Sequence, residues 1–240
     1  SKKLLHIFHM LGYDWVGGVL MYNYNNDKIE YEKLKNNNFN QLDTFYNSFI
    51  NDFGRKLESK YIVLIKELYQ KIQGGRPQEI PIGFNEYFRK YFHFDHFNND
   101  FYTIIWNIEL AKKIIKKSNL QPQKVQVKEL MKLVDEEYID RNKLIQVQKI
   151  KKSDPVILVD YNPLNAVLMI DGNHRVYSKR QQPNICLDAY ILDDFISMDC
   201  MADDVFKCLF ALHYNITKLI NYSVGNISND ELESMLINMK

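Results

Sequence analysis

Apolar residues recur at helical spacing through much of residues 42–117. The clearest stripe lies within residues 57–72 and contains Leu57, Tyr61, Leu64, Ile65, Leu68, Tyr69 and Ile72. Steps of three and four residues place these side chains on one face of a helix. Gly74, Gly75 and Pro77 then end the pattern, because neither glycine nor proline favours a helix interior.

Two further stretches of this half carry apolar side chains at the same spacing. Residues 101–117 predict a second helix, whose lysine-rich end suits the negative end of the helix dipole. A run of aromatic residues also predicts core side chains at helical spacing rather than a platform for stacking bases: Phe84, Tyr87, Phe88, Tyr91 and Phe92. Nearer the N-terminus, residues 19–22 and 28–31 flank an Asn-Asn-Asp turn and predict a β-hairpin.

After residue 119 the pattern changes to a mixture of strands and helices. A helix is predicted over residues 124–134 and a half-buried strand over residues 144–150. Residues 155–160 and 166–170 are apolar runs on either side of a turn of Asn and Pro, which predicts a hairpin.

A helix over residues 174–182 and a strand over residues 185–192 are predicted to follow this hairpin. The next helix, over residues 203–221, has His213 on its apolar side, which predicts a core histidine. Ser228 with Glu231 three residues later is a capping box that begins a last helix.

The predicted fold class is therefore α+β. A largely helical N-terminal half, residues 1–118, is expected to pack on a small mixed sheet in residues 119–240, with helices at the C-terminal end. The sequence indicates no role for residues 1–118.

Composition narrows the class of protein. The chain has 240 residues, of which 46% are hydrophobic and 25% charged, as in globular proteins. A net charge of +1 excludes a polybasic nucleic-acid binder, although a local basic patch stays open. No apolar run reaches the roughly 18 residues of a membrane span, so no membrane partner is predicted. Three cysteines, an odd number, predict free thiols and a cytoplasmic location.

One segment combines residues that suit an anion: Asp171, Gly172, Asn173, His174 and Arg175. They lie between a predicted strand and the start of a predicted helix, where the first backbone N–H groups have no partner within the helix. Gly172 permits a positive φ or a close backbone approach. His174 and Arg175 add side-chain donors, and arginine can bind a phosphate through two hydrogen bonds. We expect a phosphate-binding turn.

These residues resemble the ParB/sulfiredoxin-like superfamily, whose signature at this place is Gly-x-His-Arg or Gly-x-x-Arg. The resemblance covers residues 155–192 and extends more loosely back to about residue 120. It implies a ParB/sulfiredoxin-like mixed sheet and a bound nucleotide (ATP, ADP or CTP) with Mg²⁺. Its phosphates would be held by Gly172, Asn173, His174 and Arg175. Lys128, or equally Lys124, would be the basic partner on the preceding helix.

The sequence also departs from this family. Asn173 stands where sulfiredoxins carry their catalytic cysteine, and an amide cannot act as a thiolate nucleophile. A sulfiredoxin-type reductase is therefore excluded. The resemblance leaves phosphoryl transfer or nucleotide hydrolysis, with Asp171 and His174 as candidate catalytic residues. The structural alternatives are a helix cap for Asp171, a surface ion pair for Arg175 and a capping or packed histidine for His174.

Two other functions remain open: a ParB-like nuclease, and a non-catalytic DNA- or protein-interaction module of a mobile element or phage. A nuclease would need carboxylates that hold a metal ion near His174. The helices after residue 203 offer no basic recognition helix, which disfavours chromosome partition. The sequence does not decide whether the protein is an enzyme, nor what phosphate acceptor it would use.

Overall fold

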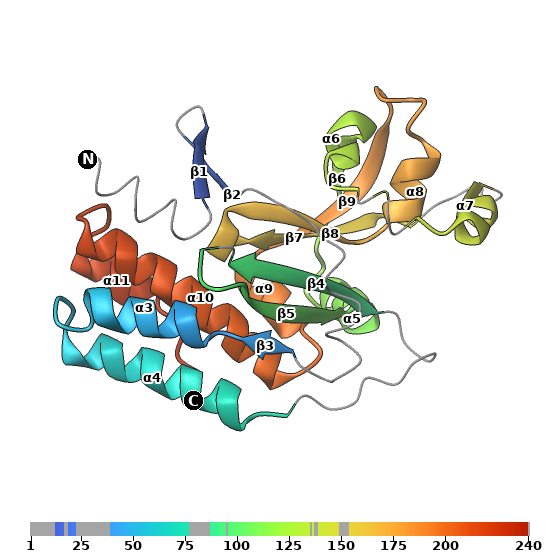
Figure 1. The fold of residues 1–240 in the computed structure, drawn as a ribbon. Coiled ribbons are helices and arrows are strands. Elements are labelled where there is room, and N and C mark those ends of the chain that lie inside the picture. The colour runs from blue at the N-terminus through green and yellow to red at the C-terminus, as the bar shows by residue number, and fades with distance from the viewer. Residues whose placement is uncertain are drawn as a thin grey trace.

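The computed structural model describes residues 13–16, 19–22, 39–76, 87–94, 96–134, 136, 139–148 and 154–239. As predicted, the fold is α+β (Figure 1). The elements in chain order are β1 (Tyr13–Val16), β2 (Val19–Tyr22), β3 (Asn40–Gln41), α3 (Asp43–Phe53), α4 (Ser59–Gly74), β4 (Tyr87–Phe94), β5 (Asp100–Asn107), α5 (Ile108–Lys117), β6 (Gln123–Gln126), α6 (Val127–Met131), α7 (Arg141–Gln148), β7 (Val156–Tyr161), the 3₁₀ helix η2 (Asn162–Leu164), β8 (Ala166–Asp171), α8 (Asn173–Ser178), β9 (Cys186–Leu192), α9 (Asp194–Asp199), α10 (Asp204–Ser223) and α11 (Asn229–Met235).

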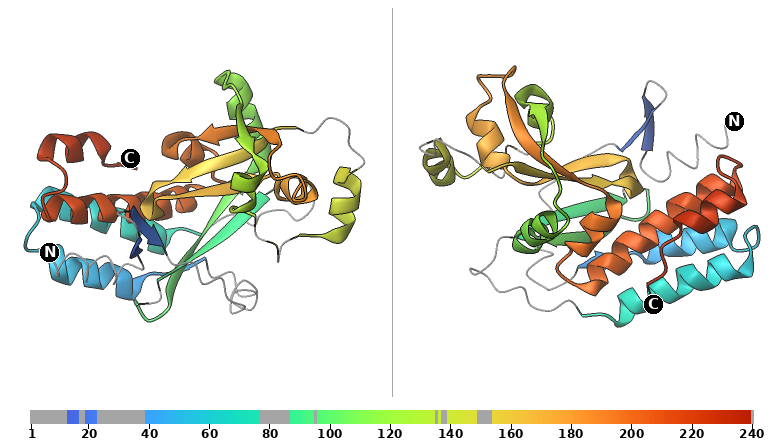
Figure 2. Two further views of the ribbon diagram at one scale, coloured as in Figure 1. Left: turned by 90° about the horizontal axis from the view of Figure 1, so that it is seen from above. Right: turned by 180° about the vertical axis from the view of Figure 1, so that it is seen from behind.

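The predicted stripe on residues 57–72 forms the buried face of α4. Its buried side chains include Tyr61, Ile65, Leu68 and Ile72. This face packs against α10, and the two helices run side by side with α3 in a layer at one end of the molecule (Figures 1 and 2). The stripe therefore stabilises contacts between segments far apart in sequence.

Two predicted helical segments of this half are strands. Residues 87–94 form β4 and residues 100–107 form β5, so the predicted helix over 101–117 begins only at Ile108. Strand β5 lies in the middle of a sheet with the order β3-β5-β4, and its residues 100–106 are all buried. A strand buried on both faces lacks the alternation of apolar and polar residues, so its periodicity does not distinguish it from a buried helix.

The N-terminal hairpin also differs from the prediction. Residues 19–22 pair in antiparallel fashion with residues 13–16, not with residues 28–31. In the sequence Gly17 and Gly18 separate the two strands, and two-residue hairpin loops favour glycine. Residues 28–31 lie outside the described residues.

The second sheet has the strand order β6-β9-β7-β8. Strands β7 and β9 are parallel, whereas β7 pairs antiparallel with β8 and β9 with β6. The predicted order of hairpin, helix and strand over residues 155–192 is confirmed. Asn165 closes the hairpin with a φ of 50°, a left-handed conformation that asparagine tolerates.

Two predictions between residues 120 and 150 were wrong. Residues 123–126 form an edge strand, and only residues 127–131 of the predicted helix 124–134 are helical. Residues 141–148 form helix α7 where a strand was expected over 144–150. Asp140 precedes α7 and caps its start, because its carboxylate accepts the N–H groups of Asn142 and Lys143 at 2.7 and 3.2 Å. Ile145 on this helix is 52% exposed, so local capping rather than burial favours α7.

Buried side chains form two clusters on opposite faces of the second sheet. The second, smaller cluster consists of Leu130, Val156, Leu158, Met169, Val176 and Ala189, under α6 and α8. The main core lies on the other face and includes Ile157, Val159 and Ile170 together with α4, β5 and α10. The main core includes residues from both sides of position 118. The predicted division of the chain into two regions at 118–119 stays a prediction.

The C-terminal helices match the sequence pattern. Thirteen residues of α10 are buried, among them His213, as predicted. The capping box of Ser228 and Glu231 begins α11. None of the helices in the described ranges is long and apolar enough to span a membrane. Cys186, Cys200 and Cys208 are free thiols, as predicted; the cytoplasmic location stays a prediction.

A buried polar chain joins three elements inside the main core. The Tyr102 hydroxyl lies 2.7 Å from the Tyr161 hydroxyl and 2.7 Å from His213 Nδ1. Complete burial lowers the pKa of His213 to about 3, because the charged imidazolium would lose its hydration. The folded state therefore requires a neutral imidazole at this position.

We expect the free energy of unfolding to fall as the pH drops through the ordinary histidine pKa of 6.5 toward 3. Below pH 6.5 the unfolded chain binds a proton at His213 that the folded chain excludes, which costs about 2 kcal/mol at pH 5. His213→Gln removes this titration. Denaturant unfolding of the wild type and of His213→Gln at pH 7.5 and 5 measures how much each loses in free energy of unfolding. Titrations that the two proteins share cancel when the two losses are subtracted. If both proteins lost the same free energy of unfolding between pH 7.5 and 5, His213 would not be a buried neutral base.

Candidate functional site

The residues of the predicted phosphate-binding turn lie where β8 ends and α8 begins. Gly172 is the residue before α8 and has a φ of +110°, a conformation that side chains rarely adopt. A Cβ atom at this position would lie 2.4 Å from Cγ1 and 2.8 Å from Cβ of Val156. Glycine is therefore required twice, by the backbone conformation and by the close approach of β7.

Arg175 holds the turn against the start of β7. Its Nη2 donates to the carbonyl oxygen of Pro155 at 3.1 Å and forms an ion pair with Asp171 Oδ2 at 3.1 Å. Both charged side chains are largely buried, with 18% and 17% of their surface exposed. The Nε of Arg175 is buried and has no hydrogen-bond partner among the described residues. Nη2 of Arg175 is thus held by contacts within the protein, whereas its buried Nε has no acceptor among the described residues.

His174 connects the turn to the segment before α7. Its Nε2 accepts the backbone N–H of Asp140 at 2.9 Å, which places the ring proton on Nδ1. Burial lowers the pKa of His174, the nearby Lys143 lowers it further, and Asp140 opposes both. The imidazole at pH 7 is therefore a neutral donor through Nδ1. Asn173 Nδ2 donates to the Met169 carbonyl oxygen at 3.2 Å.

The structure brings the five predicted turn residues together, and the two predicted lysines lie on the neighbouring elements β6 and α6. Lys128 is exposed on α6, which packs against α8, and forms no hydrogen bond or ion pair with the turn among the described residues. Lys124 forms an ion pair with Asp188 at 2.9 Å on the neighbouring strand. The basic partner expected from this region stays a prediction.

The turn offers few groups for a metal ion. Asp171 faces Arg175, and within the described ranges no three His, Cys, Asp or Glu side chains are arranged to hold a metal. The Mg²⁺ that the family resemblance implies would have to bind through the nucleotide phosphates and water, as Mg²⁺ commonly does.

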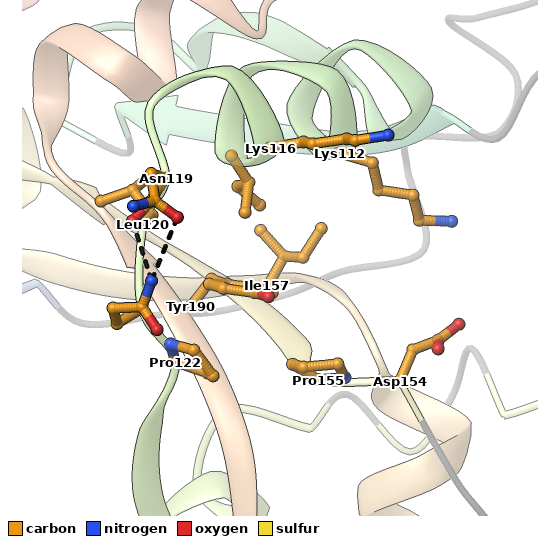
Figure 3. Close-up of a pocket in the computed structure, with 11 residues that line it drawn as sticks. Lys112, Lys116, Asn119, Leu120, Pro122, Asp154, Pro155, Ile157 and Tyr190 are labelled. Carbon is orange, nitrogen blue, oxygen red and sulfur yellow. Dashed lines mark hydrogen bonds between the residues drawn. The ribbon is translucent and has the colours of Figure 1, made fainter.

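A cavity of about 400 Å³ lies on the other face of the sheet (Figure 3). Ile157 of β7 and Tyr190 of β9 form its sheet side, and Lys112 and Lys116 of α5 border it from above in Figure 3. Pro155 also borders this cavity, so one residue contacts both Arg175 and the cavity. Figure 1 shows α5 and α8 on opposite sides of the sheet.

Comparison of the chain with family models, with curated proteins and with solved structures found no match.

Sequence reasoning missed several residues of this region. It interpreted Lys112 and Lys116 only as charges at a helix end, and it did not consider Asp154 or Tyr190. Their proximity depends on the packing of α5 against a sheet formed later in the chain. The spacing of Lys112, Ile115 and Lys116, which places them on one helix face, was the only signal available.

Gly172→Ala is expected to lower the free energy of unfolding by about 2–4 kcal/mol, from a strained φ and a clash with Val156. Gly225→Ala is the matched control, since Gly225 also has a positive φ, +80°, but nothing lies within 4 Å of an added Cβ. Gly225→Ala should lower the free energy of unfolding by about 1–2 kcal/mol, from the strained φ alone. Urea unfolding measures both. Equal losses would contradict the close packing of the turn on β7.

Proposed function

We propose that this chain binds a nucleotide through its phosphates at the turn formed by residues 171–175. The observation that carries the proposal is a set of unused donors in one place. The N–H groups of Asn173, His174 and Arg175 have no backbone acceptor among the described residues. An anion beside them would accept these hydrogen bonds.

Side chains of the same turn add to this set. Nδ1 of His174 carries a proton, and the Nε of Arg175 is a buried donor without an acceptor in the described structure. A buried donor without a partner costs about 1–3 kcal/mol, and a phosphate oxygen would remove that cost. The ion pair with Asp171 reduces the net charge, so hydrogen bonds rather than charge alone would provide affinity.

The resemblance to the ParB/sulfiredoxin-like superfamily supports a nucleotide as the phosphorylated ligand. It points to ATP, ADP or CTP with Mg²⁺, bound where a hairpin leads through a glycine turn into a helix. Lys128 on the adjacent helix α6 would be within the same neighbourhood of the fold. Phosphoryl transfer or hydrolysis would be a further step, in which Asp171, paired with Arg175 through Oδ2, would accept a proton at Oδ1.

Calorimetric titration with ATP, ADP and CTP in the presence of Mg²⁺ tests the proposal. The wild type should bind at least one nucleotide at submillimolar concentration. Arg175→Ala should weaken binding roughly ten- to a hundredfold, since a charge-assisted hydrogen bond is worth on the order of 1.5–3 kcal/mol. His174→Ala removes a neutral donor and should weaken it roughly two- to tenfold at pH 7.

Lys179→Ala is the control, because Lys179 follows the last residue of α8 and lies away from its first turn. It should leave affinity within about twofold of the wild type. Thermal unfolding of each variant without nucleotide separates a lost ligand contact from a lost contact with Pro155. If the wild type binds none of the three nucleotides at millimolar concentration, the proposal fails and the interaction-module hypothesis replaces it.

A further inference from the structure

The cavity beside α5 is bordered by an apolar surface on one side and charged groups on another. Ile115, Leu120, Ile157 and the ring of Tyr190 supply the apolar part. Volumes of about 300–1,000 Å³ are typical of small-molecule sites, and this cavity of about 400 Å³ lies within that range. Its volume and lining suit a small ligand with an apolar body.

The charges at the cavity define the polar end of such a ligand. Lys116 is exposed, and its ammonium group has no ion pair or hydrogen bond within the described part of the chain. Lys112 lies 3.4 Å from Glu109, so its charge is partly compensated. Asp154 is an exposed carboxylate on the same side of the cavity as Lys112 (Figure 3). One negative charge is favoured beside the lysines, whereas several would be repelled by Asp154 and Glu109.

We propose that this cavity binds a small organic anion with a single negative charge on an aromatic body, of the carboxylate or sulfonate class. The aromatic body lies on Ile157 and Tyr190, and the acid group faces Lys112 and Lys116. A nucleoside triphosphate fits this charge pattern poorly, because the carboxylate of Asp154, which also borders the cavity, repels its additional negative charges.

The cavity is separate from the phosphate site proposed at the turn. Gly172 packs against Val156, whereas the cavity is bordered by Ile157, the next residue along β7. Successive residues of a strand face opposite sides of a sheet, so β7 lies between the two places. A ligand in the cavity therefore touches neither His174 nor the first turn of α8.

Fluorescence titration with anilinonaphthalene sulfonate, an aromatic monoanion, tests the proposal on the folded chain. The double variant Lys112→Gln/Lys116→Gln should weaken binding roughly tenfold. Asp154→Asn should strengthen it about two- to fivefold, because a repulsive charge is removed. Opposite effects from the two changes are the signature of an anion bound between these groups.

Lys113→Gln/Lys117→Gln is the matched control. These lysines lie on the same helix and are exposed, but they do not border the cavity. The control should leave affinity within about twofold, and so should His174→Ala at the turn. Equal weakening by both lysine pairs would reveal general charge attraction and overturn the proposal. Displacement of the dye by ATP with Mg²⁺ would show that the cavity takes the nucleotide, and it would also overturn it.

Discussion

Strand β7 is the constraint on which both layers of the structure depend. Val156 and Leu158 enter the second cluster, while Ile157 and Val159 enter the main core on the other face. Successive side chains of a strand point to opposite faces of a sheet, so β7, whose two faces are both covered, contributes to both clusters. The strand ends at Tyr161, whose hydroxyl joins the buried chain through Tyr102 to His213. Side chains of this six-residue segment therefore contribute to both clusters of the molecule.

The position of β7 also determines the conformation of the turn. Because Val156 is fixed in the second cluster, Gly172 can approach it only without a Cβ atom. The carbonyl oxygen of Pro155, one residue earlier, is then fixed as an acceptor for Arg175. Donors held in this way lose little conformational freedom when a ligand binds, which favours affinity.

The sequence predicted those parts of the fold in which local signals agree. Over residues 155–192 apolar runs alternate with turn residues, so strands, turn and helix were all recognisable. Strand β5 was not, because burial on both faces removes its alternation. Helix α7 was not, because it depends on the Asp140 cap more than on an apolar face. At the candidate site, the sequence predicted the role of Gly172 as a turn residue, but the partner of Arg175 twenty residues earlier requires the folded sheet.

The charge at the turn is poorly explained by stability alone. A largely buried ion pair such as that of Arg175 and Asp171 often stabilises no more than apolar residues of similar size, because both ions lose hydration. The unpartnered Nε adds to this cost within the described structure. The second cluster already holds α8 on the sheet through Val176, which is completely buried. An apolar side chain of similar size would often serve folding equally well, whereas the anion that we propose at the turn would give the buried cation a binding role.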